Sequence, residues 1–165
     1  MAGTDFRELE EFRDKLEALA NGKCSNLCDD IAKELAARLL AKTVRRTPVG
    51  NYENTYEYEN NGNGGSLVMS GRAGGTLRRG WTAEPLYRSG TQHNVNIINQ
   101  VPYASYVEYG HRQEPGRYVP AINKRLKASW VPGQFMLTDS AHEINAKAPQ
   151  IVKAKMNEFL NKELG

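Results

Sequence analysis

Two stretches of the chain contain residue types that could support catalysis. The stretch AHEINAK begins like the helix of a zinc protease, but the position four residues after His142 is Ala146, so the second imidazole ligand is missing. Asp139, Ser140 and His142 are the residue types of a catalytic triad. As close neighbours on one helix, they cannot aim a base at a hydroxyl group and a third group at the base. We therefore expect a helix start and a solvated helix face here, and no catalytic residue.

The cysteines and histidines are the next candidates, because their side chains bind metals. Cys24 and Cys28 are four residues apart on a predicted helix, a geometry that a disulfide cannot close without unwinding the turn. We expect reduced, buried thiols. The three histidines, His93, His111 and His142, are far from this pair in the sequence, so we predict no metal site.

A glycine-rich stretch, GNGGSLVMSGRAGGTLRRG, could place backbone N–H groups around a phosphate. It lacks the Gly-Lys-Ser/Thr ending of a phosphate-binding loop and the buried strand that should precede it. The stretch is more typical of a flexible loop, and we expect no cofactor.

The net charge of +3 is unevenly distributed along the chain. Residues 43–130 contain eleven Lys and Arg against six Asp and Glu, whereas residues 1–42 contain seven against nine. Basic side chains interleaved with Tyr and Trp could bind phosphates and stack on bases, so a DNA-contacting protein remains the alternative function. The same arginines could form bidentate pairs with the acidic first helix of a neighbouring subunit. The basic residues are Arg45, Arg46, Arg72, Arg78, Arg79, Arg88, Arg112, Arg117, Lys124, Arg125 and Lys127.

The elements that must position these side chains follow from hydrophobic periodicity. Apolar residues at spacings of three and four predict helices at both ends of the chain, with Pro149 kinking or restarting the last one. Between them, WTAEPLY and NVNIINQV predict two antiparallel strands, with Pro85 near a sheet edge or a bulge. No apolar run is long enough to span a bilayer. We therefore expect an α+β single domain of 165 residues with N-terminal helices in 1–45, an extended arm or hairpin in 51–75, a small antiparallel sheet with a short helix in 76–131, and a C-terminal helix in 135–164.

The stretch VPYASYVEYGHR predicts a short helix after a strand. Tyr103 and Tyr106 share one helix face, and Gly110 suits a left-handed cap at the end of the helix. Glu108 is spaced to pair with Arg112 one turn later. The tyrosine rings could cover the sheet, or they could face a partner, because a tyrosine offers a large apolar ring with a polar tip.

This stretch resembles the Tyr-Ala-x-x-Val-Glu-aromatic-Gly signature of the neck, or tail-completion, proteins of tailed phages. RRTPVG followed by GTLRRGW resembles the Thr-Pro-Val and Gly-x-Leu-basic-basic-x-Trp segment of that family. WVPGQFMLTDSAHEI resembles the opening of its last helix. The arm between the first two motifs, and Gly80 before Trp81, depart from the family pattern.

The resemblance implies a structural, non-catalytic subunit of a phage, prophage or phage-tail-like bacteriocin, assembled in the host bacterial cytoplasm. It implies a ring, commonly of six copies, that ends the tail tube on the side of the head, with DNA passing through the lumen. Its implied partners are further copies of itself, tail tube, sheath or tail-terminator proteins, and head-completion or connector proteins. We expect the arm and the HRQEPGR turn to join these partners. The expected interface residues are Tyr52, Tyr56, Tyr58, Arg72, Arg78, Arg79, Trp81, Tyr103, Tyr106, Glu108, Tyr109, His111, Arg112 and Arg117.

Overall fold

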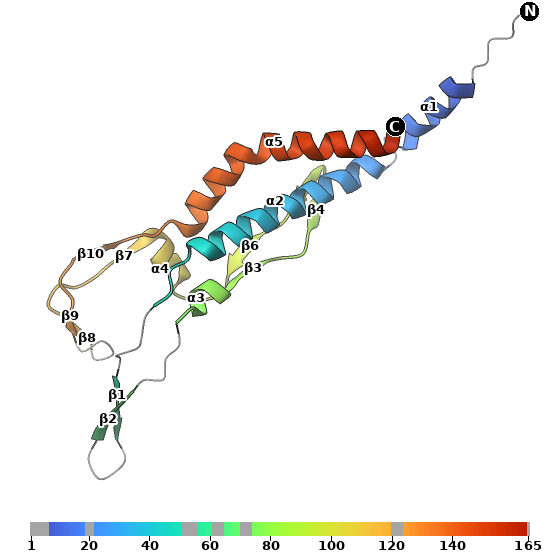
Figure 1. Cartoon of the computed structure of the whole chain (residues 1–165). Helices are drawn as coiled ribbons and strands as arrows, with labels where there is room; N and C mark the ends of the chain where they lie inside the picture. The colour runs from blue at the N-terminus through green and yellow to red at the C-terminus, as the bar shows by residue number, and fades with distance from the viewer. Residues whose placement is uncertain are drawn as a thin grey trace, which may run out of the picture. The chain divides into compact units, whose positions relative to one another are not determined.

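The protein has an α+β fold, as the sequence predicts (Figure 1). The structure is a computed structural model, and it describes residues 7–18, 22–50, 56–60, 65–69, 74–119 and 124–164. Helices occupy both ends of the described chain, and short antiparallel ladders lie between them.

Five helices are present in the described residues. The C-terminal helix runs continuously through Pro149, so the proline does not restart it. None of the described helices is long and apolar enough to cross a membrane. The helices are α1 (Arg7–Ala18), α2 (Cys24–Arg46), α3 (Thr76–Arg79), α4 (Ala104–Tyr109) and α5 (Met136–Leu164).

The strands are short and form two-stranded ladders. The pairs are β1 with β2, β3 with β6, β4 with β5, β7 with β10, and β8 with β9. Within the arm, β1 and β2 pair as an antiparallel hairpin in which Tyr56 is opposite Met69. The strands are β1 (Tyr56–Asn60), β2 (Gly65–Met69), β3 (Trp81–Ala83), β4 (Tyr87–Ser89), β5 (Gln92–Asn94), β6 (Ile97–Asn99), β7 (Gly110–Arg112), β8 (Tyr118–Val119), β9 (Lys124–Arg125) and β10 (Trp130–Pro132).

The two strands predicted over 81–87 and 94–101 are each interrupted. The first becomes β3 and β4, and the partner segment becomes β5 and β6. Pro85 lies in the interruption, where its missing N–H cannot weaken a ladder. The predicted pairing is therefore confirmed, whereas the predicted continuity of the two strands is wrong.

The chain forms two compact units. The first unit contains Met1–Leu39, Ala83–Ile97 and Ala141–Gly165, and the second contains Leu40–Thr82 and Ile98–Ser140.

In the first unit, ion pairs connect α2 to α5. Lys23 pairs with Glu163 near one end of both helices, and Glu34 accepts from Lys155 at 3.3 Å and also pairs with Arg38. The pKa of Glu34 is lowered by its hydrogen bond from Arg38 and then by that from Lys155. These pairs agree with the arrangement of α2 and α5 side by side in Figure 1.

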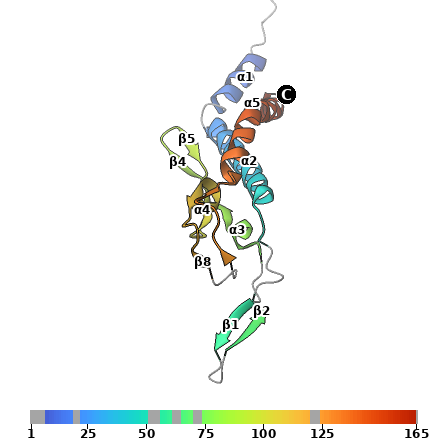
Figure 2. The same ribbon diagram turned by 90° about the vertical axis from the view of Figure 1, so that its left-hand side faces the viewer.

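Asp29 connects α2 to the hairpin of β4 and β5, which lies beside that helix in Figure 2. Its carboxylate accepts hydrogen bonds from Arg88 of β4 and from Nδ1 of His93 of β5, the latter at 2.6 Å. The hydrogen bond from Arg88, followed by that from His93, lowers the pKa of Asp29 from 3.8 to about 2. The charged form of Asp29 therefore stabilises the folded first unit.

This depressed pKa predicts a specific dependence of stability on pH. Because the pKa of Asp29 is lower in the folded chain than in the unfolded chain, its contribution is fully present above pH 3.8 and is lost as the pH falls toward 2. Asp29→Asn should remove this part of the acid sensitivity, measured as the free energy of unfolding in urea at pH 5, 4, 3 and 2. The exposed Asp14 of α1 provides the control, and Asp14→Asn should keep the wild-type profile. Identical profiles for wild type and Asp29→Asn would contradict the prediction.

Candidate functional site

The candidate site lies in the second unit and is organised around α4. The helix starts with a hydrogen bond from the N–H of Ala104 to the carbonyl of Val101 at 2.9 Å, and it ends at Gly110. Gly110 has a φ of 84° and a ψ of 172°, so the predicted glycine end is confirmed but its left-handed helical conformation is wrong. A Cβ at this position would lie 2.4 Å from the carbonyl oxygen of Val131. Only glycine allows β10 to approach the end of α4 this closely.

Glu108 caps the start of α5 and does not pair with Arg112 as predicted. Its carboxylate accepts from the N–H groups of Leu137 and Thr138 at 3.0 and 2.9 Å, and from the Thr138 hydroxyl at 2.8 Å. Glu108 is only 4% exposed. Because the first N–H groups of a helix have no partner within the helix, the carboxylate supplies the acceptors that they need, and the helix dipole favours its negative charge. Glu108 is therefore a structural residue of the subunit.

The tyrosines of this segment face solvent. Tyr103 is 45% exposed, Tyr106 58% and Tyr109 60%. Tyrosine rings that covered the sheet would be buried. The exposure of these three rings therefore argues against that alternative. The three residues present large apolar rings at the surface of the second unit, a composition that is typical of interaction surfaces.

His111 follows the helix on β7 and lies against Tyr106. The two rings meet edge to face, with their centroids 5.9 Å apart. Nε2 of His111 lies 3.3 Å from the side-chain nitrogen of Gln113. Nδ1 is buried and has no hydrogen-bond partner in the described part of the chain. His111 thus retains an unpaired, buried ring nitrogen beside the exposed Tyr106.

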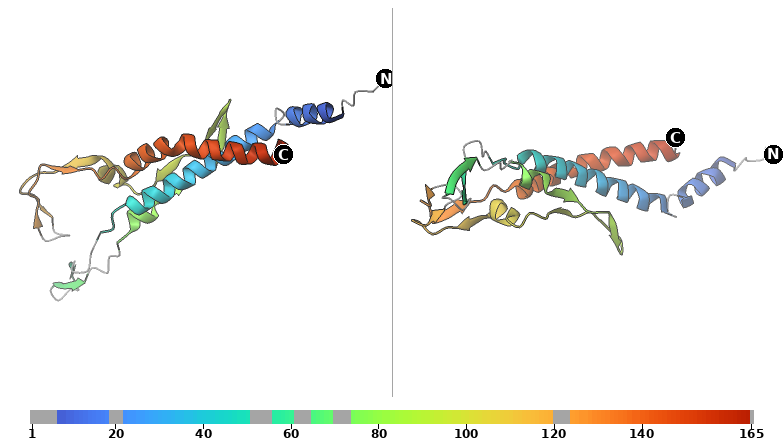
Figure 3. Two further views of the ribbon diagram at one scale, coloured as in Figure 1. Left: turned by 45° about the horizontal axis from the view of Figure 1, so that its top comes forward. Right: turned by 90° about the horizontal axis from the view of Figure 1, so that it is seen from below.

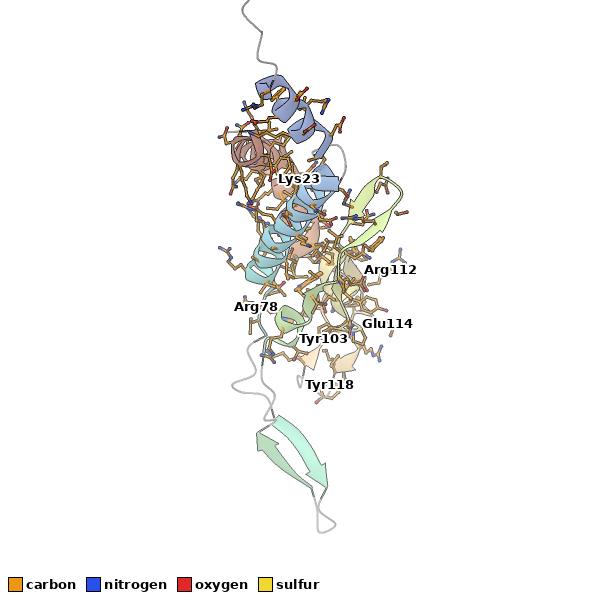
Figure 4. The ribbon with its side chains drawn as sticks, turned by 90° about the vertical axis from the view of Figure 1, so that its right-hand side faces the viewer. Lys23, Arg78, Tyr103, Arg112, Glu114 and Tyr118 are labelled. Atoms are coloured by element: carbon orange, nitrogen blue, oxygen red, sulfur yellow. The ribbon has the colours of Figure 1, made fainter. Side chains whose placement is uncertain are left out.

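A cavity of about 810 Å³ opens next to His111. Arg112 and Arg117 at its edge are exposed, and Figure 4 shows Arg112, Glu114 and Tyr118 along the segment from β7 to β8. The guanidinium of Arg125, on β9, lies over the ring of Tyr118 at 6.0 Å from its centroid. Aromatic and cationic side chains are therefore interleaved on this surface. The cavity is lined by His111, Arg112, Gln113, Glu114, Arg117, Tyr118, Val119 and Leu126.

Trp81 and Arg78 belong to the interior of the second unit. The indole N–H of Trp81 donates to the Thr47 hydroxyl at 2.8 Å, and that hydroxyl donates to the carbonyl of Thr43 at 2.7 Å. Arg78 donates to the carbonyl of Thr47 through Nε and Nη2, at 3.0 and 2.6 Å. Thr47 is fully buried and Trp81 is 8% exposed. Both predicted interface residues thus bind the end of α2 within their own subunit.

The remaining predicted interface residues belong to α3 and to the arm. Arg79 of α3 is exposed and donates to the carbonyl of Gly74 at 3.4 Å. Tyr52 and Arg72 lie outside the described residues. Tyr56 and Tyr58 belong to β1, but their side chains are not among those described.

Many of the central arginines are bound to their own chain. Arg88 pairs with Asp29, Arg46 donates to the Ser140 hydroxyl, and Arg125 donates to the carbonyl of Gly116. Arg112, Arg117, Lys124 and Lys127 are exposed, and their side chains have no partner among the described residues. The cations that remain available are therefore concentrated next to the aromatic surface.

The triad residue types and the two cysteines do not form a catalytic or metal site in the described part of the chain. Ser140, predicted on a solvated face, is fully buried, and its hydroxyl donates to the carbonyl of Met136 at 2.6 Å. His142 is exposed, so it does not face that hydroxyl. Cys24 and Cys28 are free, as predicted, but exposed rather than buried, because they lie beside the inward-facing stripe of α2 and not on it. Among the described residues, no three His, Cys, Asp or Glu side chains form a group that could hold a metal ion.

The fold and the surface together define an α+β protein whose exposed aromatic and cationic side chains suit contact with other macromolecules. The family to which it belongs is shown by comparison of the sequence. A family model described as "Bacteriophage HK97-gp10, putative tail-component" matches residues 10–110, and the chain belongs to this HK97-gp10-like family. The protein is thus a structural component of a phage tail. No curated protein and no solved structure gives a significant match.

Proposed function

We propose that this protein is a neck, or tail-completion, subunit that forms a closed ring, commonly of six copies, at the head-proximal end of the tail. The ring caps the tail tube or joins it to the head-completion or connector proteins, with DNA passing through its lumen. The observation that carries this proposal is the surface formed by α4 and β7, with exposed Tyr103, Tyr106 and Tyr109 beside Arg112 and Arg117.

A closed ring needs two different patches on each subunit, because one patch must bind the other patch of the next copy. Tyr and Arg are enriched at the centres of such interfaces, where they contribute most of the binding energy. The exposed tyrosines and the unpaired Arg112 and Arg117 supply one patch of this composition. Such a contact should bury at least about 1,000 Å² to persist.

The proposed mechanism is assembly without catalysis. Ser140 is buried and hydrogen-bonded to backbone, and His142 lies on the exposed face of α5, so the triad residue types do not form a site. Glu108 binds the start of α5. In the second unit, the Ser140 hydroxyl and the Glu108 carboxylate therefore stabilise the subunit itself.

We further propose that the arm, residues 51–75, and the HRQEPGR turn, residues 111–117, make the contacts with tail tube, sheath, tail-terminator or connector proteins. The paired strands β1 and β2 give the arm a defined hairpin. The turn carries Arg112 and Arg117. The same architecture would serve a phage, a prophage or a headless phage-tail-like bacteriocin.

The double variant Tyr106→Ala/Tyr109→Ala tests the ring surface. Since both rings are more than half exposed, the folded subunit should lose little stability. Loss of two interfacial aromatics should weaken each subunit contact by about 2 kcal/mol or more, roughly thirtyfold. Electron micrographs of tails from a producing strain that expresses only the variant should then show uncapped or unjoined tubes, and thermal melting should show a folded protein.

Tyr87→Ala is the matched control, because Tyr87 is 48% exposed and belongs to the first unit. This variant should assemble like the wild type. Normal particles with Tyr106→Ala/Tyr109→Ala would contradict the proposed role of the α4 surface. Normal tails in a strain that lacks the protein altogether would contradict the proposed function as a whole.

A further inference from the structure

Helix α5 has an apolar face that is separate from the face that binds α2. Met156 is 46% exposed and Leu160 40%, and both lie with Pro149 and Val152 along a groove of about 530 Å³. All the residues that line the groove belong to α5, so α2 does not contribute to it. Lys155, which pairs with Glu34 of α2, lies on the adjacent side of the helix, and Glu163, which pairs with Lys23, lies beyond the end of the groove at Leu160. The groove is therefore an unfilled apolar surface of the first unit.

The same unit has a second exposed apolar stripe, on α1. Phe12 is 48% exposed and Leu16 45%, and their spacing of four places them on one face of the helix. In both views of Figure 3, α1 extends beyond the end of α5 and does not lie along it. One chain thus leaves both apolar faces open at the same time.

The two faces fit each other in length and in charge. The twelve residues of α1 span about 18 Å, and the groove from Asn145 to Leu160 spans about 24 Å, at 1.5 Å per residue. Helix α1 carries five acidic and three basic side chains, a net charge of −2. The part of α5 from Asn145 to its end carries four lysines and two glutamates, a net charge of +2. Lys153 is exposed at the edge of the groove.

We propose that α1 of one copy docks in the α5 groove of the next copy, with Phe12 and Leu16 packed against Val152, Met156 and Leu160. Because the contact joins two different patches, it is heterologous, and its repetition gives a ring where the rotation between copies closes. The proposal rests on the proposed ring in that it requires a second copy. Its contact is distinct from the tyrosine surface of the second unit.

Charge substitutions test the groove. Met156→Glu places a carboxylate in the apolar contact and should weaken ring formation at least about tenfold, measured as the protein concentration at which rings dissociate in light scattering. Phe12→Glu should have the same effect from the other side of the contact. Ala154→Glu introduces the same charge at an exposed position of α5 that does not line the groove, and it should assemble like the wild type. Equal assembly of Met156→Glu and Ala154→Glu would overturn the proposal.

Cross-linking identifies the occupant of the groove. In a Cys24→Ser/Cys28→Ser background, which removes both exposed thiols, one tagged protein carries Lys15→Cys and a differently tagged protein carries Asn157→Cys. These positions lie beside the two apolar faces and leave the apolar side chains intact. A short bismaleimide should produce a cross-linked pair that contains both tags. Pairs with one tag only would show that two α1 helices or two α5 grooves meet, and would overturn the proposal.

A single chain with both Lys15→Cys and Asn157→Cys distinguishes a second copy from the chain's own α1. We expect products with the mass of two or more chains, whereas an internal cross-link alone would overturn the proposal. The function is judged separately, from tails. Completed tails together with failed cross-linking would exclude this contact and leave the neck function intact. Uncapped tails that are not restored when wild-type protein is supplied would contradict the neck function itself.

Discussion

Glu108→Ala is expected to lower the free energy of unfolding by about 3 kcal/mol, because three part-buried donors at the start of α5 lose their acceptor. For a chain of this size, such a loss corresponds to a fall in Tm of about 6–12 °C. The effect should be large because Glu108 is buried, so water cannot easily replace the carboxylate. Thermal and urea denaturation of the purified variant measure it directly.

Two further variants separate the cap from simple loss of a side chain. Glu108→Gln keeps the shape and one acceptor oxygen, and it should lose less stability than the alanine variant. Glu114→Ala removes an exposed glutamate from the edge of the nearby cavity and should stay within about 0.5 kcal/mol of the wild type. A Glu108→Ala protein as stable as Glu114→Ala would show that the start of α5 does not depend on this carboxylate.

Removal of the arm should abolish particle completion and leave the subunit folded. The two ends of the arm meet in the second unit, since a Cβ added to Gly74 would lie 2.1 Å from the carbonyl oxygen of Gly50. A short Gly-Ser linker can therefore replace residues 52–70 without pulling α2 away from α3. We expect thermal melting close to that of the wild type, and infectious or complete particles reduced to background.

An unrelated hairpin of the same length, inserted between the same ends, is the matched control. It restores the length but not the side chains of the arm, so it should also fail if those side chains bind the partner. Full particle yield from the deletion would exclude the arm as a joining element. Full yield from the unrelated hairpin alone would show that only its length matters.

The helices could be predicted from the sequence because their signals are local. Apolar residues at spacings of three and four predict N-terminal helices as far as residue 45, and α2 ends at Arg46. The last helix, predicted from Phe135, begins at Met136. Strand continuity was predicted less well, because residue preferences indicate extended backbone but do not fix where a ladder breaks. Pro85 was the available signal for that break.

The role of Glu108 was missed because its partners are 29 and 30 residues further along the chain. Spacing along the sequence offered only Arg112, one helical turn away. A signal was nevertheless present at the other end of the contact. The residue before α5 is Phe135, which has no side-chain acceptor for the first N–H groups of the helix. The start of α5 therefore needs acceptors from elsewhere in the chain, and Glu108 supplies them.

The close approach of Gly50 and Gly74 has a consequence for the natural variation of this protein. Because the base of the hairpin is closed by the fold itself, the segment between these glycines can lengthen at little thermodynamic cost, about 0.6 kcal/mol for each doubling. Insertions there can accumulate without unfolding α2 or α3. The reach of the arm is therefore free to evolve with the dimensions of whatever it touches, while the subunit that carries it stays the same.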